Sequence, residues 1–114
     1  MLGRSTYILP DFKGATVYLS GAITADACYR SKFDGWEIAV CASGAKRCLK
    51  PTIFPEGWAY EEYMEHCMIM VRRACTVLML PDWTESPGAI AERAYANSLK
   101  RTVLYAKSFK HHHP

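Results

Sequence analysis

Residues 75–106, CTVLML-PDWTESPGAIAERAYANSLK-RTVLYA, decide the fold. The stretch begins and ends with short apolar runs, residues 75–80 and 101–106, and residues 88–99 between them are rich in small side chains. An uninterrupted apolar run such as residues 75–80 is typical of a strand that is covered on both faces of a sheet. We therefore predict two strands joined by a helix over residues 88–99, an arrangement that favours parallel strands.

The same alternation continues toward the N-terminus. Residues 15–20 (ATVYLS) predict a strand, and the helix that follows is expected to end at Gly44. Residues 48–53 predict a second strand, which Pro51 shortens or places at an edge. Residues 60–74 give the clearest helix, with one apolar stripe at helical spacing. The order β-α-β-α-β-α-β predicts a doubly wound, flavodoxin-like or Rossmann-like parallel α/β sheet of four to five strands with helices on both faces.

The composition is that of one globular domain. The 114 residues are 50% hydrophobic and carry a net charge of +3. We expect a single domain over residues 1–114, with an irregular lead-in over residues 1–14, a core over about residues 15–106 and a flexible tail over residues 107–114. A charge this small does not indicate nucleic-acid binding, and the basic cluster at residues 46–50 is typical of a solvated face.

Several function classes find no support in the sequence. No apolar run approaches the length of a membrane span, and the N-terminus lacks the apolar segment of a secretory signal. The five cysteines form no CxxC pair, and the histidines at 111–113 stand at the end of the chain. We therefore expect a cytoplasmic protein with no metal and no cofactor.

Candidate binding residues follow two of the predicted strands. In parallel α/β sheets, ligands bind outside the carboxyl ends of the strands. Ser86 and Pro87 form a strong helix start, so Ser86 either caps the helix or helps its free N–H groups to bind a phosphate. Gly88 leaves room for close approach of a ligand. Glu92 lies on an apolar helix face, where a carboxylate is costly unless it is paired or functional; the alternative is a surface glutamate.

The segments VYLSGAIT (residues 17–24), LPDWTESPGAIAERAYA (80–96) and KRTVLYA (100–106) resemble the nucleoside 2-deoxyribosyltransferase family. The resemblance is strongest to its small phage and bacterial members, and the family also has nucleotide N-glycosidases among its relatives. It implies a nucleotide-handling protein, in the host cytoplasm if a phage encodes it. It also implies a homo-oligomer, most simply a dimer, since the family tends to complete its pocket with a neighbouring subunit.

The resemblance also implies roles for individual residues. Glu92 matches the nucleophile that attacks the anomeric carbon, and Tyr18 matches the tyrosine that hydrogen-bonds it. Ser86 stands where the transferases have an aspartate for the sugar hydroxyl and the glycosidases have a serine for the 5′-phosphate. The first loop, which faces that phosphate in the glycosidases, corresponds to Gly21, Ala22, Ile23 and Thr24.

One position departs from the family pattern. Cys67 stands where the family usually has an aspartate that handles the leaving base, and a thiol is mostly protonated near neutral pH. Either another acid supplies the proton, with Asp82 or His66 as candidates, or catalysis is weak or absent. Two tryptophans, Trp58 and Trp83, lie in predicted loops. We expect each of them either to stack on a base or to cover the edge of the core.

Three functions remain open at this stage. The first is hydrolysis of the N-glycosidic bond of a (2′-deoxy)nucleoside 5′-monophosphate. The second is a deoxyribosyltransferase that exchanges nucleobases, which Ser86 in place of the acid disfavours. The third is a non-catalytic module that binds or sequesters a nucleotide, which Cys67 favours.

Overall fold

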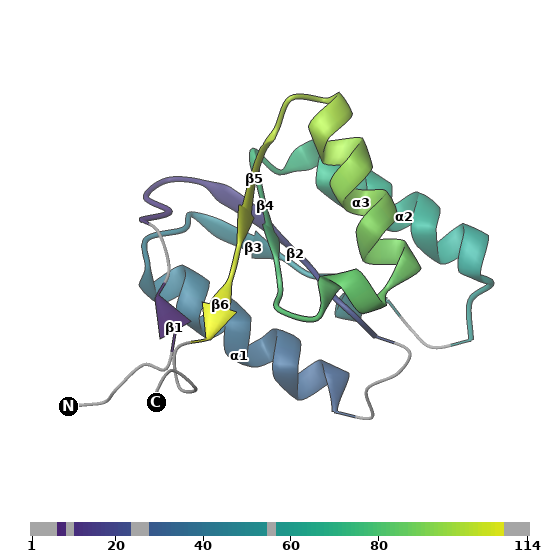
Figure 1. The fold of residues 1–114 in the computed structure, drawn as a ribbon, viewed down its shortest axis with the longest axis horizontal. Coiled ribbons are helices and arrows are strands. Elements are labelled where there is room, and N and C mark those ends of the chain that lie inside the picture. Colours follow the sequence, from purple (N-terminus) through teal and green to yellow (C-terminus); the bar gives the residue numbers. More distant parts are fainter. Residues whose placement is uncertain (1–6, 9–10, 24–27, 55–56, 109–114) are drawn as a thin grey trace.

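A four-stranded, all-parallel sheet forms the centre of the computed structural model, which describes residues 7–8, 11–23, 28–54 and 57–108. The strand order is β3-β2-β4-β5, with β2 at Thr16–Ser20, β3 at Arg47–Leu49, β4 at Thr76–Met79 and β5 at Thr102–Tyr105 (Figure 1). The prediction of a parallel, doubly wound α/β sheet is thus confirmed. Within the described part of the chain, no helix is both long and apolar enough to cross a membrane.

The two central strands are almost entirely buried, as their apolar sequences predict. Residues 17–20 pair in parallel with residues 76–79, so Ser20 lies beside Met79 at the carboxyl ends of both strands. Side chains alternate between the faces of a strand. Val17 and Leu19 therefore pack into one core, and Tyr18 packs into the other.

Three helices cover the sheet. Helix α1, Tyr29–Ala42, covers one face through Phe33, Trp36 and Val40. Helices α2, Tyr60–Arg73, and α3, Pro87–Ser98, pack against each other on the other face (Figure 1). Gly44 follows the end of α1 with a φ of 101°, a backbone conformation that favours glycine, so the predicted helix end is confirmed.

The second predicted strand is shorter than expected. Only Cys48 and Leu49 of residues 48–53 belong to β3, and Pro51–Ile53 form a short 3₁₀ helix, η1. Proline has no N–H to donate to a sheet ladder, so pairing ends before it. Another 3₁₀ helix, η2 at Trp83–Glu85, lies between β4 and α3.

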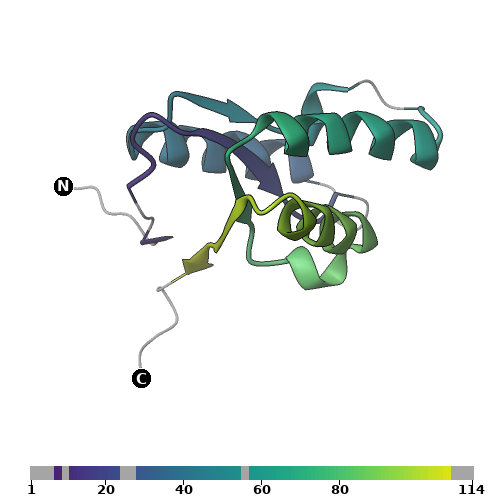
Figure 2. The same ribbon diagram turned by 90° about the horizontal axis from the view of Figure 1, so that it is seen from above.

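A two-stranded antiparallel ribbon joins the described ends of the chain. Strand β1, Tyr7–Ile8, pairs with β6, Lys107–Ser108. Figure 2 shows this ribbon beside the main sheet, on the side of the two termini. These four residues lie within the predicted irregular lead-in and the predicted tail, so the lead-in is not irregular throughout. Strands of two residues are too short to leave a periodic pattern in the sequence.

Candidate active site

Glu92 projects from the second turn of α3 toward the centre of the sheet and is only 4% exposed. Both of its carboxylate oxygens accept hydrogen bonds from β2. The Tyr18 hydroxyl donates to Oε2 at 2.7 Å, and the Ser20 hydroxyl donates to Oε1 at 2.6 Å. Tyr18 and Ser20 share one face of the central strand β2, so both can hold the carboxylate from the side of the sheet.

Burial dominates the electrostatics of this carboxylate. Loss of solvation raises the pKa of Glu92 to about 7, while hydrogen bonds from Ser20, Tyr18 and Cys67 act in the opposite direction. Burial, followed by the nearby Glu92 charge, also raises the pKa of Tyr18 well above its ordinary value, so Tyr18 remains a hydrogen-bond donor. A buried carboxylate with a strongly shifted pKa at the wall of a cavity is typical of a functional site.

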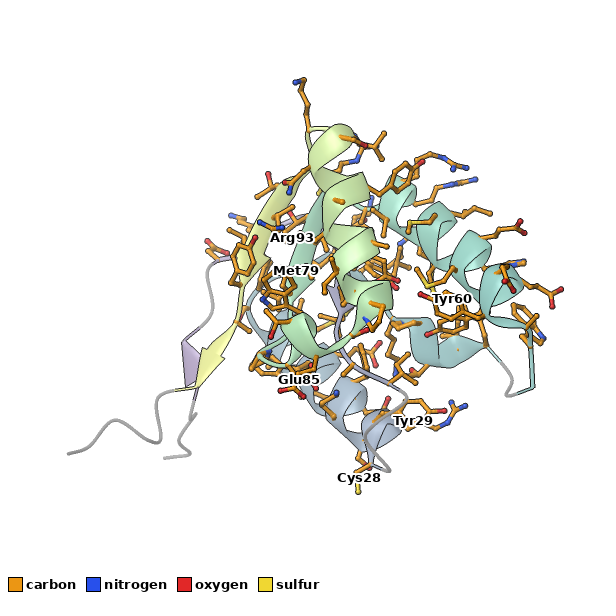
Figure 3. All side chains as sticks on the ribbon, turned by 45° about the vertical axis from the view of Figure 1, so that its right-hand side comes forward. Cys28, Tyr29, Tyr60, Met79, Glu85 and Arg93 are labelled. Atoms are coloured by element: carbon orange, nitrogen blue, oxygen red, sulfur yellow. The ribbon has the colours of Figure 1, made fainter. Side chains whose placement is uncertain are left out.

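A cavity of about 340 Å³ lies in front of Glu92. Its wall combines the loop after β2, the start of α1, η1 and the first turns of α2 and α3. Tyr29 and Tyr60, which both line it, stand at the starts of α1 and α2 (Figure 3). Of the described residues that line the cavity, Arg30 and Glu92 carry the charges. Arg30 is held at the wall by a 2.7 Å hydrogen bond from its Nη1 to the backbone oxygen of Thr52.

The first turn of α3 forms one side of the cavity. The Ser86 side chain accepts a 3.1 Å hydrogen bond from the Ala89 N–H, and Pro87 occupies the first helical position. Ser86 therefore caps the helix, as predicted from the sequence. Gly88 lies close to α2, because a Cβ at this position would stand 3.2 Å from Met64 Sδ. Its small size thus serves the packing of α3 on α2 as well as the space of the cavity.

The structure brings many of the sequence-predicted site residues to one place. Tyr18 lies behind Glu92, in contact with it. The predicted residues that line the cavity are Gly21, Ile23, Trp58, Ser86, Gly88 and Glu92. Thr24 lies outside the described residues.

Three other predicted residues stand away from the cavity wall. Asp82 Oδ1 accepts a 3.1 Å hydrogen bond from the Ala22 N–H, and its Oδ2 lies 2.5 Å from Lys32 Nζ. These contacts tie the loop after β2 to the loop after β4. Trp83 packs against the side chains of Arg93 and Tyr105, toward the outer edge of β5.

Sequence reasoning missed several residues of the site. Ser20 was detectable, because it shares the strand face of Tyr18 by alternation. The cavity is also lined by Arg30, Thr52 and Phe54. No local sequence motif marks these three residues as part of a site. Phe54 stacks on Trp58, with ring centroids 5.1 Å apart.

Cys67 and His66 occupy neighbouring positions of α2 with different surroundings. Cys67 is fully buried beside Glu92, and burial raises the pKa of its thiol to about 12. His66 packs on the rings of Phe54 and Trp58, and its Nδ1 lies 2.9 Å from the backbone oxygen of Glu62. Across the described ranges, no three histidine, cysteine or acidic side chains gather as metal ligands would.

Comparisons with known proteins agree with this architecture. A family described as "Domain of unknown function (DUF4406)" matches residues 15–105. A solved structure titled "2-desoxiribosyltransferase from Leishmania mexicana" is similar with a TM-score of 0.62 and 15% identity, over 79% of this chain and 62% of that chain. This chain thus spans less than two thirds of that protein, and the similarity confirms the predicted resemblance at the level of the fold. A search of curated proteins found no match.

Proposed function

We propose that this chain, which belongs to the family described as "Domain of unknown function (DUF4406)", hydrolyses the N-glycosidic bond of a (2′-deoxy)nucleoside 5′-monophosphate. The observation that carries this proposal is the Glu92 carboxylate, which is buried, held by two hydroxyls and set in the wall of a cavity. The fold that the chain shares with a deoxyribosyltransferase supports it.

In the proposed reaction, a Glu92 oxygen bonds to the anomeric carbon C1′ as the bond between C1′ and the base nitrogen breaks. The base leaves with the electron pair of that bond and takes up a proton. Water then attacks C1′ of the glycosyl ester. Its hydroxyl goes to C1′, its proton replaces the one that the base took up, and the sugar phosphate and the free Glu92 carboxylate are released. Tyr18 and Ser20 keep the carboxylate in one orientation, so little reorganisation is needed on the way to the transition state.

Two features of the cavity suit a ligand that carries a phosphate. Arg30 contributes a fixed positive charge to the wall. Ser86 and Gly88 line the cavity at the start of α3. The backbone N–H groups at the N-terminus of a helix stabilise an anion such as a phosphate. A phosphate held by these groups would place the sugar over Glu92 by remote binding energy.

Aromatic side chains suit the base. Phe54 and Trp58 line the cavity and stack on each other, which gives a flat apolar surface on the α2 side. Stacking on such rings stabilises any nucleobase, because every base has a π-face.

A second candidate function is a module that binds a nucleotide without cleaving it. Cys67 favours this candidate, since a thiol whose pKa is raised to about 12 keeps its proton and cannot readily pass it to a leaving base. Asp82 as the acid stays a prediction; its carboxylate contacts Ala22 and Lys32. Exchange of bases between deoxynucleosides is the remaining alternative, and Ser86 in place of an acid disfavours it.

The direct test is to incubate the protein with 2′-deoxynucleoside 5′-monophosphates and the matching nucleosides, and to follow free base by chromatography. We expect free base from at least one monophosphate and slower release from its nucleoside. Binding without any release would favour the sequestering module. Release that requires a second base as acceptor would favour the transferase.

Arg30→Gln and Ser86→Ala are both expected to weaken binding of a nucleoside monophosphate, by roughly 1–3 kcal/mol, because each removes a group facing the phosphate. Binding of the unphosphorylated nucleoside should change little. Calorimetric titration of both ligands measures the difference.

The stability of the two variants separates their roles further. Ser86→Ala should also lower the unfolding free energy by about 1 kcal/mol, because it loses the cap to Ala89. Arg73→Gln is the matched control for Arg30→Gln, since Arg73 is exposed in the last turn of α2. If both cavity variants bind the monophosphate as tightly as this control, the phosphate site is elsewhere.

A further inference from the structure

Lys32 and Asp82 both bind the backbone of one residue in the loop after β2. That residue is Ala22, which is only 5% exposed. Its N–H donates a 3.1 Å hydrogen bond to Asp82 Oδ1, and its backbone oxygen accepts a 2.6 Å hydrogen bond from Lys32 Nζ. Lys32 Nζ also lies 2.5 Å from Asp82 Oδ2, which closes the contacts into a ring. We call this arrangement of Ala22, Lys32 and Asp82 the Ala22 clamp.

The Ala22 clamp joins three segments at the carboxyl ends of the central strands. Ala22 follows β2, Lys32 lies in the first turn of α1, and Asp82 lies between β4 and η2. An aspartate just before a helix commonly caps that helix with its side chain. In the described structure, the Asp82 side chain makes no capping hydrogen bond to η2. Its carboxylate instead contacts the other two segments.

The neighbours of Ala22 on either side, Gly21 and Ile23, line the cavity. The loop lies close against Asp82, because a Cβ at Gly21 would stand 3.0 Å from Asp82 Oδ1. Peptide units are rigid, so a displacement of the Ala22 backbone also moves the residues beside it. The Ala22 clamp therefore fixes part of the wall of the cavity that contains Glu92.

We propose that Lys32 and Asp82 are positioning residues, which hold the loop after β2 in the shape that binds the ligand. Neither side chain belongs to the described lining of the cavity, so both act through Ala22. A loop that already has its binding shape does not have to be ordered by the ligand, and this favours affinity. The inference rests on the proposed function, because it takes the ligand to be a nucleoside monophosphate. It gives Asp82 a role in binding in place of proton transfer to the base.

The test compares Asp82→Asn, Lys32→Met and the double variant. Asp82→Asn keeps an oxygen that can accept from the Ala22 N–H but loses the charge that attracts Lys32. Lys32→Met keeps an unbranched side chain and loses the contacts that Nζ makes with Ala22 and Asp82. The matched control is Glu37→Gln, which removes one negative charge elsewhere on α1. Glu37 Oε1 lies 2.9 Å from Lys50 Nζ, and neither of these two residues is among those that line the cavity.

The dissociation constant of a 2′-deoxynucleoside 5′-monophosphate is measured by calorimetry, and base release is followed in single turnovers at saturating nucleotide. Asp82→Asn and Lys32→Met are each expected to weaken binding by about three- to tenfold, as they would if the loop held its binding shape about a third to a tenth of the time. The double variant should lose no more than the weaker of the two single variants, because both changes break the same clamp. Release at saturation should change little, and Glu37→Gln should bind as the wild type does.

The direction of each change separates positioning from other roles. If the two residues acted on the ligand only through their charges, Lys32→Met would weaken binding of the anionic nucleotide and Asp82→Asn would strengthen it. If Asp82 were the acid, Asp82→Asn would slow release and leave the dissociation constant unchanged. Either result overturns the inference. Lower melting temperatures with unchanged binding in both single variants would also overturn it, because the pair would then serve only the stability of the fold.

The outcomes also distinguish this inference from the proposed function. Wild-type protein that binds the nucleotide but releases no base contradicts the hydrolase, while the same dissociation constants still decide the role of Lys32 and Asp82. Wild-type protein that binds no nucleoside monophosphate overturns both. If Lys32→Met does not fold, Asp82→Asn decides alone: weaker binding supports the inference, and equal or tighter binding overturns it.

Discussion

Glu92→Gln is expected to abolish base release while nucleotide binding changes only a few-fold. Glutamine has nearly the shape of glutamate and can still accept a hydrogen bond from Tyr18 or Ser20, so the cavity wall is preserved. Its amide is not a nucleophile toward C1′, and loss of a covalent nucleophile lowers the rate by several orders of magnitude. Single-turnover release of free base and calorimetric binding measure the two quantities.

The matched control is Glu85→Gln. Glu85 is exposed in η2, shortly before α3, and undergoes the same chemical change away from the cavity wall (Figure 3). It should release base at the wild-type rate. If Glu92→Gln keeps the activity of this control, another group is the nucleophile.

The same substitution is expected to change how stability depends on pH. The pKa of Glu92 is about 7 in the folded protein against 4.5 for the ordinary side chain. Between these values the folded protein holds a proton that the unfolded chain has released. The stability that this proton brings is complete below the lower value and is lost as the pH rises through the higher one, by roughly 3 kcal/mol in total.

Glu92→Gln removes this loss, so its unfolding free energy should exceed that of the wild type increasingly from pH 5 to about pH 8. Urea unfolding of both proteins at several pH values measures the difference, and Glu85→Gln should follow the wild type. If the difference in unfolding free energy between Glu92→Gln and the wild type does not grow with pH, the raised pKa of Glu92 is contradicted. By the same ionisation, base release by the wild type should rise with pH through about 7, because the nucleophile must be ionised.

Most of the central fold could be predicted from the sequence because its signals are local. The apolar runs at β2 and β4 are strands covered on both faces, and the Ser86–Pro87 pair fixes the start of α3. The strand over residues 48–53 was overestimated, because its composition continues past Pro51 while its hydrogen bonding cannot. The dimer expected from the resemblance stays a prediction.

The site residues on strands and helices could be predicted from the sequence. The positions of the site residues in loops were harder to predict. Ser20 joins Tyr18 at Glu92 because of strand alternation, which applies to any sequence once the strand is known. Asp82 follows β4, as a catalytic acid would. The orientation of its carboxylate is set by contacts with the Ala22 N–H and Lys32 Nζ, which are far away in the sequence. No local pattern encodes such a contact.

The ribbon of β1 and β6 brings the first and last described residues of the chain next to each other. Tyr7 pairs with Ser108 in register, so the two backbones are neighbours at the point where the described structure begins and ends. A short linker between these positions would close the chain without crossing the central sheet. New ends could then be opened at the exposed turn around Gly44, on the N-terminal side of β3 and away from Glu92. The order of the strands in space would be unchanged, although their order along the chain would be permuted.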